Sequence, residues 1–267
     1  MKISVVTISF NQANYLSACL DSVAAQEGPW EHIIVDPGST DGSRDLIAQR
    51  RNQFSEIILD KDNGPADGLN RGFAKATGRI FYYLNSDDVV FPGAFNEARE
   101  YLTRCPNVDV VVGHGNVLDT DGSTGRPLYS DPVSRFGLAH AGSILIQPAT
   151  FIRAHAFQRV GGFNNANRSN WDGELIVDLF LSGARFKIVN HHWGGYRIHE
   201  KSITGTGNLD LRVAEWGRER YERLMGGKPR WYTYYIRQLY RARRLIRHPS
   251  LLNARLYGGR VYGSMRK

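Results

Sequence analysis

Two adjacent carboxylates follow a strongly apolar segment of the sequence. Residues 79–84 (RIFYYL) predict a β-strand, and the polar residues 85–88 (NSDD) come directly after it. Neighbouring carboxylates repel each other unless a cation or strong hydrogen-bond donors compensate. Oxygen ligands on a short turn suit Mg²⁺ or Mn²⁺ that also binds a substrate diphosphate. A helix N-cap at Asp88, ahead of the turn at 91–93, explains the same residues equally well.

A second pair of carboxylates, Asp172 and Glu174, lies at the start of a helical pattern over 172–182. A carboxylate held near a reacting hydroxyl can act as its general base. Asp172 is also a suitable N-cap for this helix, so the residue types leave both roles open.

Asp36 ends a strand-like run at 32–36 and is followed by the turn 38–42 (GSTDG). This arrangement suits the base or ribose of a nucleotide, but it is also a common connection between a strand and a helix. The sequence has no Gly-Lys-Ser/Thr phosphate loop, and no GxGxxG motif follows its first strand. These absences argue against kinases and dinucleotide-dependent dehydrogenases.

Three histidines, His191, His192 and His199, raise the question of a zinc site. Their spacing matches no standard zinc pattern, and no cysteine lies near them. We therefore expect solvated or hydrogen-bonding histidines.

The elements that would position these residues alternate between strands and helices. The predicted strands are 2–8, 32–36, 56–60 and 79–84, and helices are predicted over 14–25, around 46–47 and over 67–76. Short connections in this order predict an α/β fold with a mostly parallel sheet and helices on both faces. Ligands bind such sheets beyond the carboxyl ends of the strands. We therefore expect one polar rim, formed by Thr7, Ser9, Asn11, Asp36 and residues 85–88.

The second half of the sequence is less regular. Strands are predicted over 108–112, 116–118, 126–129 and 143–146, and helices over 154–160, 172–182 and 209–247, the last broken at 226–229. We expect a catalytic domain over 1–208, with a nucleotide-binding half (1–104) and an acceptor-binding half (105–208). Residues 209–267 would form a basic helical extension.

The net charge of +8 is distributed unevenly. Residues 212–267 contain fifteen basic and three acidic residues, so this segment carries +12 and the remainder −4. Two cysteines and no secretory signal favour a reducing compartment, so we expect a cytoplasmic protein.

The basic extension contains an amphipathic pattern. Tyr235, Leu239, Ala242 and Ile246 form one helical stripe, and a second stripe consists of Arg237, Arg241, Arg244 and His248. Such a helix suits the surface of an anionic membrane, and would make the protein peripheral on the inner face of the cell membrane. Alternatively, the apolar stripe packs on the catalytic domain. Nucleic-acid binding is a third interpretation, which we do not expect.

Several segments, taken in order, resemble glycosyltransferase family 2, whose members are inverting enzymes with a GT-A fold. The matching segments are 4–11 (SVVTISFN), 32–42 (HIIVDPGSTDG), 62–72 (DNGPADGLNRG), 76–78 (ATG), 84–88 (LNSDD), 147–163 (QPATFIRAHAFQRVGGF) and 197–199 (RIH) with Ser202. The resemblance covers about residues 1–205 and implies transfer of a sugar from a nucleotide sugar to an acceptor hydroxyl.

The resemblance also implies roles for individual residues. The nucleotide pocket would contain Thr7, Ser9, Asn11 and Asp36; the donor sugar and phosphates would meet Asp67, Asn70, Asn85, Ser86 and Arg197; the metal would be held at Asp87, Asp88 and His199. Asp172 would be the general base, with Glu174 as the second acid of its motif. Three residues depart from the family pattern: Pro37 and Asn85 replace acids, and Trp171 replaces the Glu before the base.

We therefore expect Mn²⁺ or Mg²⁺ as cofactor, a UDP-sugar as the favoured donor, and a glycan or lipid-linked acceptor in bacterial surface-polysaccharide synthesis. Self-association is left open. Two alternatives remain: a catalytically silent nucleotide-sugar-binding subunit, and a sugar-1-phosphate nucleotidyltransferase. The latter would be expected to carry a Gly-rich basic loop after its first strand, where this chain has residues 9–12 (SFNQ).

Overall fold

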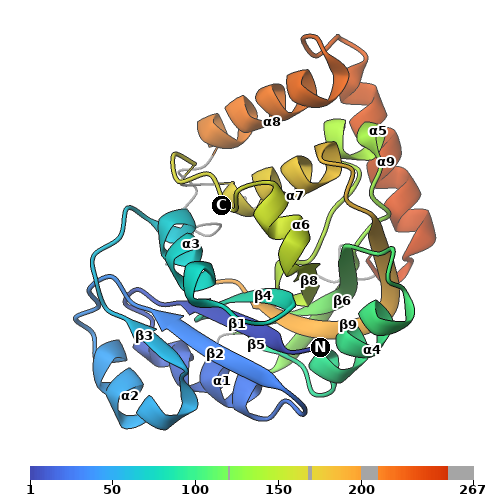
Figure 1. The fold of residues 1–267 in the computed structure, drawn as a ribbon. Coiled ribbons are helices and arrows are strands. Elements are labelled where there is room, and N and C mark those ends of the chain that lie inside the picture. The colour runs from blue at the N-terminus through green and yellow to red at the C-terminus, as the bar shows by residue number, and fades with distance from the viewer. Residues whose placement is uncertain (120, 168–169, 200–209, 252–267) are drawn as a thin grey trace.

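The computed structural model describes residues 1–119, 121–167, 170–199 and 210–251. A sheet with strand order β3-β2-β1-β4-β8-β6-β9-β5, to which β7 adds by pairing with β6, runs through the molecule (Figure 1). Helices cover both faces of this sheet, which confirms the predicted α/β architecture.

The first part of the sheet is parallel. It consists of β1 (Ile3–Ile8), β2 (Trp30–Val35), β3 (Glu56–Ile58) and β4 (Ile80–Asn85). All four strands were predicted, and each ends within two residues of its predicted end. Their carboxyl ends therefore lie along one edge.

The second part of the sheet is mixed. Its strands are β5 (Val89–Val90), β6 (Val110–Leu118), β7 (Thr124–Leu128), β8 (Thr150–Arg153) and β9 (Phe186–Arg197). β8 is antiparallel to β4 and β6, whereas β9 runs parallel to β6 and antiparallel to β5. The two predicted halves, 1–104 and 105–208, thus share one sheet; the predicted boundary at 208 lies outside the described residues.

The helices divide between the two faces. One face carries α3 (Pro65–Lys75), α6 (Ala154–Arg159) and α7 (Trp171–Leu181), and the other α1 (Ala13–Ala24), α2 (Ser43–Gln49) with the 3-10 turn Arg51–Gln53, and α4 (Ala94–Arg104). Each face buries its own apolar cluster, and the 3-10 turn Gln147–Ala149 precedes β8.

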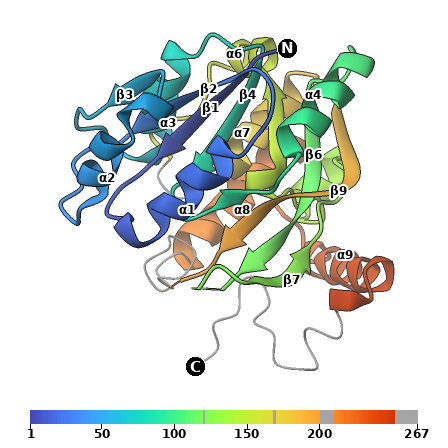
Figure 2. The ribbon, with the colours of Figure 1, turned by 90° about the horizontal axis from the view of Figure 1, so that it is seen from below.

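The C-terminal extension is helical, as predicted. α8 (Asp210–Met225) packs on α7 and on the short α5 (Arg135–Ala139), and it ends at Gly226, whose φ is +74°. α9 (Thr233–Arg247) then runs along the outer edge of the molecule, near β7 in Figure 2. Among the described residues, no helix combines the length and apolarity needed to cross a bilayer.

Two sequence-based interpretations are wrong. Residues 143–146 form no strand, because β8 occupies the position between β4 and β6. Ile144 accepts from Asp131 N and Ile146 donates to Ser130 Oγ, but no strand among the described residues pairs with this segment. Asp88 caps no helix, since it precedes β5, and α4 begins only after Gly93.

Candidate active site

The carboxyl ends of β1, β2 and β4 meet at one level of the sheet. Ile8 lies opposite Val35 on one side and Asn85 on the other. The next residues, Ser9, Asp36 and Ser86, therefore leave the sheet side by side. This is the polar rim that the strand order predicts.

Asp36 is fully buried, and its carboxylate organises the loop that follows β2. Oδ1 accepts hydrogen bonds from the backbone N of Gly38 at 3.0 Å and of Ser39 at 2.8 Å, and the Ser39 hydroxyl donates to Oδ2 at 2.6 Å. Arg44 Nε lies 3.1 Å from Oδ1. The described side chains thus occupy both carboxylate oxygens of Asp36 and fix the shape of the loop.

Asn11 ties this loop to the end of β1. Its backbone adopts a positive φ of 54°, its amide N donates to Ser39 Oγ at 2.8 Å, and its side-chain oxygen accepts from Thr40 N at 2.9 Å. Asparagine tolerates this left-handed conformation better than most residues. The two loops beside the rim are therefore joined by direct hydrogen bonds.

Thr7 and Ser9, two residues apart on the chain, differ in their bonding. Thr7 is buried within β1, and its hydroxyl is hydrogen-bonded to His32 Nε2 at 2.9 Å, so it supports the rim from inside the sheet. Burial lowers the pKa of His32 to about 3, which keeps that ring neutral. Ser9 is only 2% exposed, and its hydroxyl has no hydrogen-bond partner among the described residues. An unpaired buried hydroxyl is costly, so a polar ligand at this point would recover free energy.

The two adjacent acids point in different directions. Asp88 is 1% exposed; its Oδ1 accepts from the backbone N of Arg197 at 2.9 Å, and its Oδ2 lies 3.4 Å from Asn85 Nδ2. Burial, and next the charge of Asp87, raise the pKa of Asp88 well above its usual value. Asp87 instead turns toward His199, with Oδ2 and Nε2 3.0 Å apart. Sharing one turn therefore does not make the two carboxylates equivalent.

The end of β9 completes the rim from the far side of the sheet. Arg197 donates from Nε to the backbone oxygen of Asp87 at 2.9 Å, and its guanidinium lies 4.9 Å from the ring centre of Tyr15. The ring of His199 is 4.7 Å from the same Tyr15 ring. Tyr15 was not predicted as a site residue, because an aromatic residue in an amphipathic helix gives no signal of its own. Ser202, the last residue of the matching segment, lies outside the described residues.

Asp87 and His199 fit a cation that is also held by a substrate. Their facing atoms are 3.0 Å apart, which is about the separation of neighbouring ligands around an ion with bonds of about 2.1 Å. Within the described part of the chain, no group of three or more His, Cys, Asp or Glu could hold a metal ion. Mg²⁺ and its analogues commonly use one or two protein ligands and complete their shell with phosphate oxygens and water. Of the three predicted metal residues, Asp87 and His199 meet, whereas Asp88 bonds to the backbone.

Asp67 and Asn70 lie on α3, beside the loop that precedes α7. Asp67 accepts hydrogen bonds from Asn63 N and from Arg71, each at 2.9 Å. The hydrogen bond from Asn63 N is the largest of the effects that lower the pKa of Asp67. Asn70 bonds to both backbone groups of Phe163, donating to its oxygen at 2.8 Å and accepting from its N at 2.9 Å. Asn70 thus links α3 to the loop that leads into α7.

Asp172 and Glu174 occupy the first turn of α7 but differ in their contacts. Asn170 is the N-cap, so Asp172 is not, and the capping alternative is wrong. Asp172 is half-buried; burial raises its pKa, and its carboxylate accepts hydrogen bonds only from backbone N–H groups of the same turn among the described residues, with Gly173 N at 2.8 Å. Glu174 is buried and accepts from Asn164 at 3.1 Å and Asn167 at 2.7 Å.

Glu174 also pairs with Arg223 of α8 at 3.4 Å, so it connects α7 to two neighbouring segments. Trp171, the residue before Asp172, is buried against two aromatic rings. Its ring centre lies 5.7 Å from that of Tyr83 and 5.3 Å from that of Phe163. Trp171 therefore packs in the core beneath Asp172. Asp172 is the less constrained of the two acids.

The other two histidines lie away from the rim, on β9. His191 Nδ1 is 3.0 Å from Glu97, and His192 Nδ1 is 2.7 Å from the side-chain oxygen of Asn116. Both are exposed, and the ring of His192 also lies 5.6 Å from that of His114 and 5.9 Å from that of Tyr129.

Comparison of the sequence with known proteins gives a consistent result. Residues 4–161 match the family model described as "Glycosyl transferase family 2". A PGL/p-HBAD biosynthesis glycosyltransferase of Mycobacterium tuberculosis is 37% identical over 187 residues, which cover 68% of this chain and 70% of that protein. An uncharacterized glycosyltransferase of Nostoc sp. is 29% identical over 211 residues, 74% of this chain; the match spans 65% of that relative, slightly under two thirds of its length.

Solved structures of similar fold are also glycosyltransferases. S. aureus TarS in complex with UDP-GlcNAc has a TM-score of 0.67 at 17% identity, covering 88% of this chain and 69% of that one. The mannosyltransferase PcManGT of Pyrobaculum calidifontis, in complex with GDP-Man and Mn²⁺, has a TM-score of 0.62 at 16% identity and covers 93% of this chain and 70% of the other. At these identities the likeness concerns the fold.

Proposed function

The chain belongs to glycosyltransferase family 2 and has the GT-A fold, and we propose that it transfers a sugar from a nucleoside diphosphate sugar to an acceptor hydroxyl with inversion of configuration. One observation carries the proposal: side chains from β1, β2 and β4 meet the end of β9 at one rim, around the pair Asp87 and His199.

The donor occupies this rim. The buried hydroxyl of Ser9 supplies a polar atom without a partner among the described residues, and Asp87 with His199 would hold a divalent cation. We favour a uridine diphosphate sugar. TarS, a neighbour in fold, binds UDP-GlcNAc, and PcManGT binds GDP-Man with Mn²⁺. The bound cation would supply positive charge for the diphosphate leaving group.

Asp172 is the general base. It accepts the proton of the acceptor hydroxyl, whose oxygen attacks the anomeric carbon on the face opposite the nucleotide, and the bond to the diphosphate breaks. The raised pKa of Asp172 makes its carboxylate a stronger base than an exposed aspartate. Glu174 fixes the start of α7 through Asn164, Asn167 and Arg223, and thereby positions Asp172.

The acceptor is a glycan, carried on a lipid, in the synthesis of a bacterial surface polysaccharide. The names of two relatives support this class: a putative teichuronic acid biosynthesis glycosyltransferase of Bacillus subtilis, 38% identical over 90 residues, and the PGL/p-HBAD enzyme. A lipid-linked acceptor would bring the cytoplasmic enzyme to the inner face of the cell membrane as a peripheral protein.

A donor screen followed by a transfer assay tests the proposal. UDP, GDP, ADP and CDP are each added with Mn²⁺ or EDTA, and a ligand that binds the folded state raises the unfolding midpoint. UDP with Mn²⁺ should give the largest increase, and incubation with its sugars should release UDP. Proton NMR of the transferred sugar should show the anomeric configuration opposite to that of the donor. Nucleotide binding without hydrolysis or transfer of any sugar would instead favour the silent binding subunit.

A further inference from the structure

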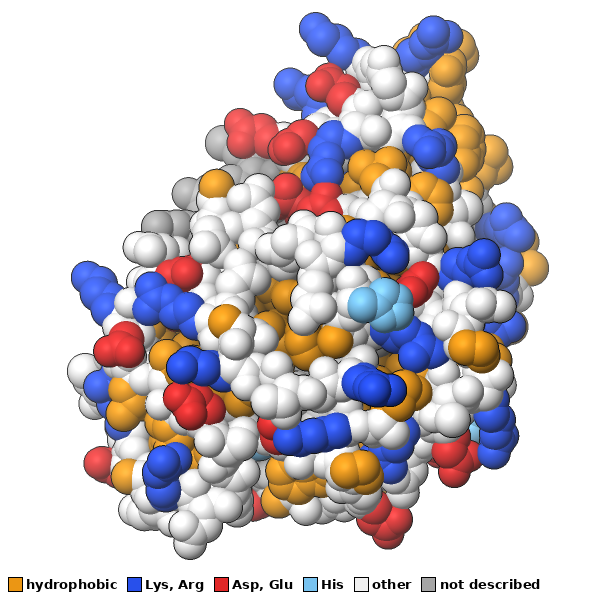
Figure 3. Space-filling model, viewed as in Figure 1, with side chains coloured by type: hydrophobic (Ala, Val, Ile, Leu, Met, Phe, Trp, Pro, Cys, Tyr) orange, Lys and Arg blue, Asp and Glu red, His pale blue; other side chains and the backbone are white. Residues whose placement is uncertain are grey.

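α9 exposes its apolar stripe. The exposed fractions are 81% for Trp231 just before the helix, 60% for Tyr235, 67% for Leu239 and 80% for Ile246. These side chains recur at the spacing of one helical face, and hydrophobic and basic side chains alternate along this edge in Figure 3. The stripe therefore points away from the catalytic body, contrary to the alternative in which it packs on that body.

The opposite face of α9 attaches the helix to the body. Arg244 pairs with the buried Asp131 at 3.0 Å and donates to the backbone oxygen of Tyr129. His248, just after the helix, stacks on the Tyr129 ring at 3.9 Å with an interplanar angle of 6°. Tyr240 lies so close to Gly142 that a Cβ there would come within 2.2 Å of its ring. These contacts fix the rotation of α9, so the stripe stays outward.

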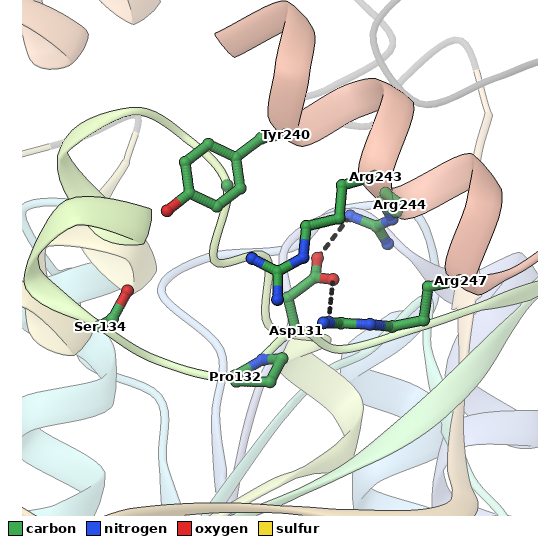
Figure 4. Close-up of a pocket in the computed structure, with 8 residues that line it drawn as sticks. Asp131, Pro132, Ser134, Tyr240, Arg243, Arg244 and Arg247 are labelled. Carbon is green, nitrogen blue, oxygen red and sulfur yellow. Dashed lines mark ion pairs between the residues drawn. The ribbon is translucent and has the colours of Figure 1, made fainter. Parts of the chain in front are cut away.

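A basic pocket of about 200 Å³ lies beside the stripe, between α9 and residues 131–142. Asp131, Ser134, Tyr240, Arg243, Arg244 and Arg247 line it (Figure 4). Three guanidinium groups face one carboxylate there, and the Asp131 carboxylate is paired with Arg244 and, at 4.0 Å, with Arg247. The balance of charge is positive and suits the oxygens of a phosphate.

The positive charge around α9 indicates which kind of molecule can cover the apolar stripe. Residues 228–250 contain seven basic and no acidic residues, and residues 252–267 add four basic and no acidic ones. A second copy of the chain on the same face, or the chain's own last residues, would bring like charges together, which is unfavourable at an interface. An anionic bilayer offers apolar chains for the stripe and phosphates for the arginines. Tryptophan and tyrosine rings at the edge of the stripe also suit the headgroup level.

We propose that α9 is a membrane-docking surface: its apolar stripe lies in the interfacial layer of an anionic bilayer, and the pocket at Arg243, Arg244 and Arg247 receives a lipid phosphate. This docking gives the proposed peripheral location a physical surface, and it uses none of the residues that we assign to sugar transfer.

Co-sedimentation of the full chain with vesicles tests the docking. Vesicles of phosphatidylcholine alone are compared with vesicles containing phosphatidylglycerol, and we expect binding only to the latter, weakening as salt is added. L239E/I246E should abolish binding, because two carboxylates would enter the interfacial layer. R243Q/R247Q should weaken it at least tenfold, because the two basic residues near the surface together contribute about 2 kcal/mol, which corresponds to a change of about thirtyfold.

The matched control is R51Q/K61Q, which removes the same charge from exposed residues flanking β3, across the molecule from α9 (Figure 1). This control should bind vesicles within twofold of the wild type. All variants should keep the wild-type circular dichroism spectrum and the thermal shift with UDP and Mn²⁺, so loss of docking and loss of donor binding are distinguished.

Three outcomes would overturn the proposal. The first is equal vesicle binding by L239E/I246E and the wild type. The second is a lower molecular mass in solution for L239E/I246E without anionic vesicle binding by the wild type, which would make the stripe a contact between copies. The third is stabilisation by inorganic phosphate that R243Q/R247Q removes, again without vesicle binding, which would make the pocket a site for soluble phosphate.

Discussion

The rim at the strand ends and the outer face of α9 differ in which side chains they bury and which they expose. At the rim, charged side chains such as Asp36, Asp88 and Arg197 are buried among hydrogen-bond partners. On α9, large apolar side chains such as Leu239 and Ile246 lie in the open. Buried polar networks fix orientation, because each group has few alternative partners. An exposed apolar stripe fixes nothing within the protein.

This contrast indicates that the rim is the region for catalysis and that the outer face of α9 is a region for contacts with other molecules. A change of a few atoms at the rim should greatly reduce turnover or donor affinity while the fold persists. A large change of side chain on α9 should leave both fold and chemistry intact. The following experiments test that contrast with substitutions at the rim and on α9.

Asp172→Asn should have the largest effect. The amide keeps the shape of the side chain but cannot take up the acceptor proton, so we expect turnover to fall by about two to four orders of magnitude with donor binding preserved. The acid limb of the wild-type pH profile should lie above the usual aspartate pKa, because burial raises the pKa of Asp172. Steady-state kinetics with a fixed donor measure both. Turnover near the wild-type rate would exclude Asp172 as the base.

Asp87→Ala should remove the metal-dependent part of nucleotide affinity, about tenfold to a hundredfold. The side chain is partly exposed and faces His199, so the fold should be unaffected. Titration calorimetry with UDP, in Mn²⁺ and in EDTA, measures the difference. Asp45→Ala, in the first turn of α2, is the control and should leave it unchanged. If Mn²⁺ improves UDP binding equally in Asp87→Ala and the wild type, the cation is held elsewhere.

His32→Gln tests burial beneath the rim through pH. The folded pKa is lowered from 6.5 to about 3, so protons bind the unfolded chain first as the pH falls below 6.5. Above pH 6.5 His32 is neutral in both states and does not disfavour folding. As the pH falls from 6.5 toward 3, the unfolded chain takes up a proton that folded His32 does not, and the free energy of unfolding decreases. By linkage, the loss between pH 7 and pH 5 is about 2 kcal/mol. Urea unfolding at several pH values should show a flatter decline for His32→Gln; an identical slope would mean that His32 is not buried.

Leu239→Ala should have the smallest effect, within about 0.5 kcal/mol of wild-type stability, because the side chain is exposed. The same change in α3, Leu69→Ala, removes a fully buried side chain and should cost about 2–5 kcal/mol. Chemical denaturation of the pair measures the contrast directly. Comparable losses would show that Leu239 is covered within the protein.

The sequence predicts the parallel half of the sheet because its strands are apolar runs separated by short helical segments. It does not reveal β9, whose middle residues Asn190, His191 and His192 are polar and exposed. The signal that could have identified β9 is the pair Gly194 and Gly195. A Cβ at Gly194 would lie 2.2 Å from the backbone oxygen of Pro148, and glycine inside a strand often marks such close approach.

The rim could be predicted as a set of residues, but not as a set of bonds. Nothing in the turn 85–88 indicates that Asp88 turns to the backbone of Arg197 and Asp87 to His199. Similarly, the amphipathic pattern of α9 gives two faces without saying which one meets the body. Asp131 and Tyr129 decide that, and they lie far from α9 in sequence.

The bond between Asp87 and His199 has a consequence for how the protein is made. These residues are 112 positions apart, and Asp88 and Arg197 are 109 apart. Contacts between distant parts of a chain must overcome a large loss of loop entropy, which slows their formation. During synthesis from the N-terminus, the parallel strands emerge long before β9. The rim is therefore completed late: a shortened polypeptide ending before β9 would carry its neighbouring aspartates without the backbone and imidazole partners that hold them apart.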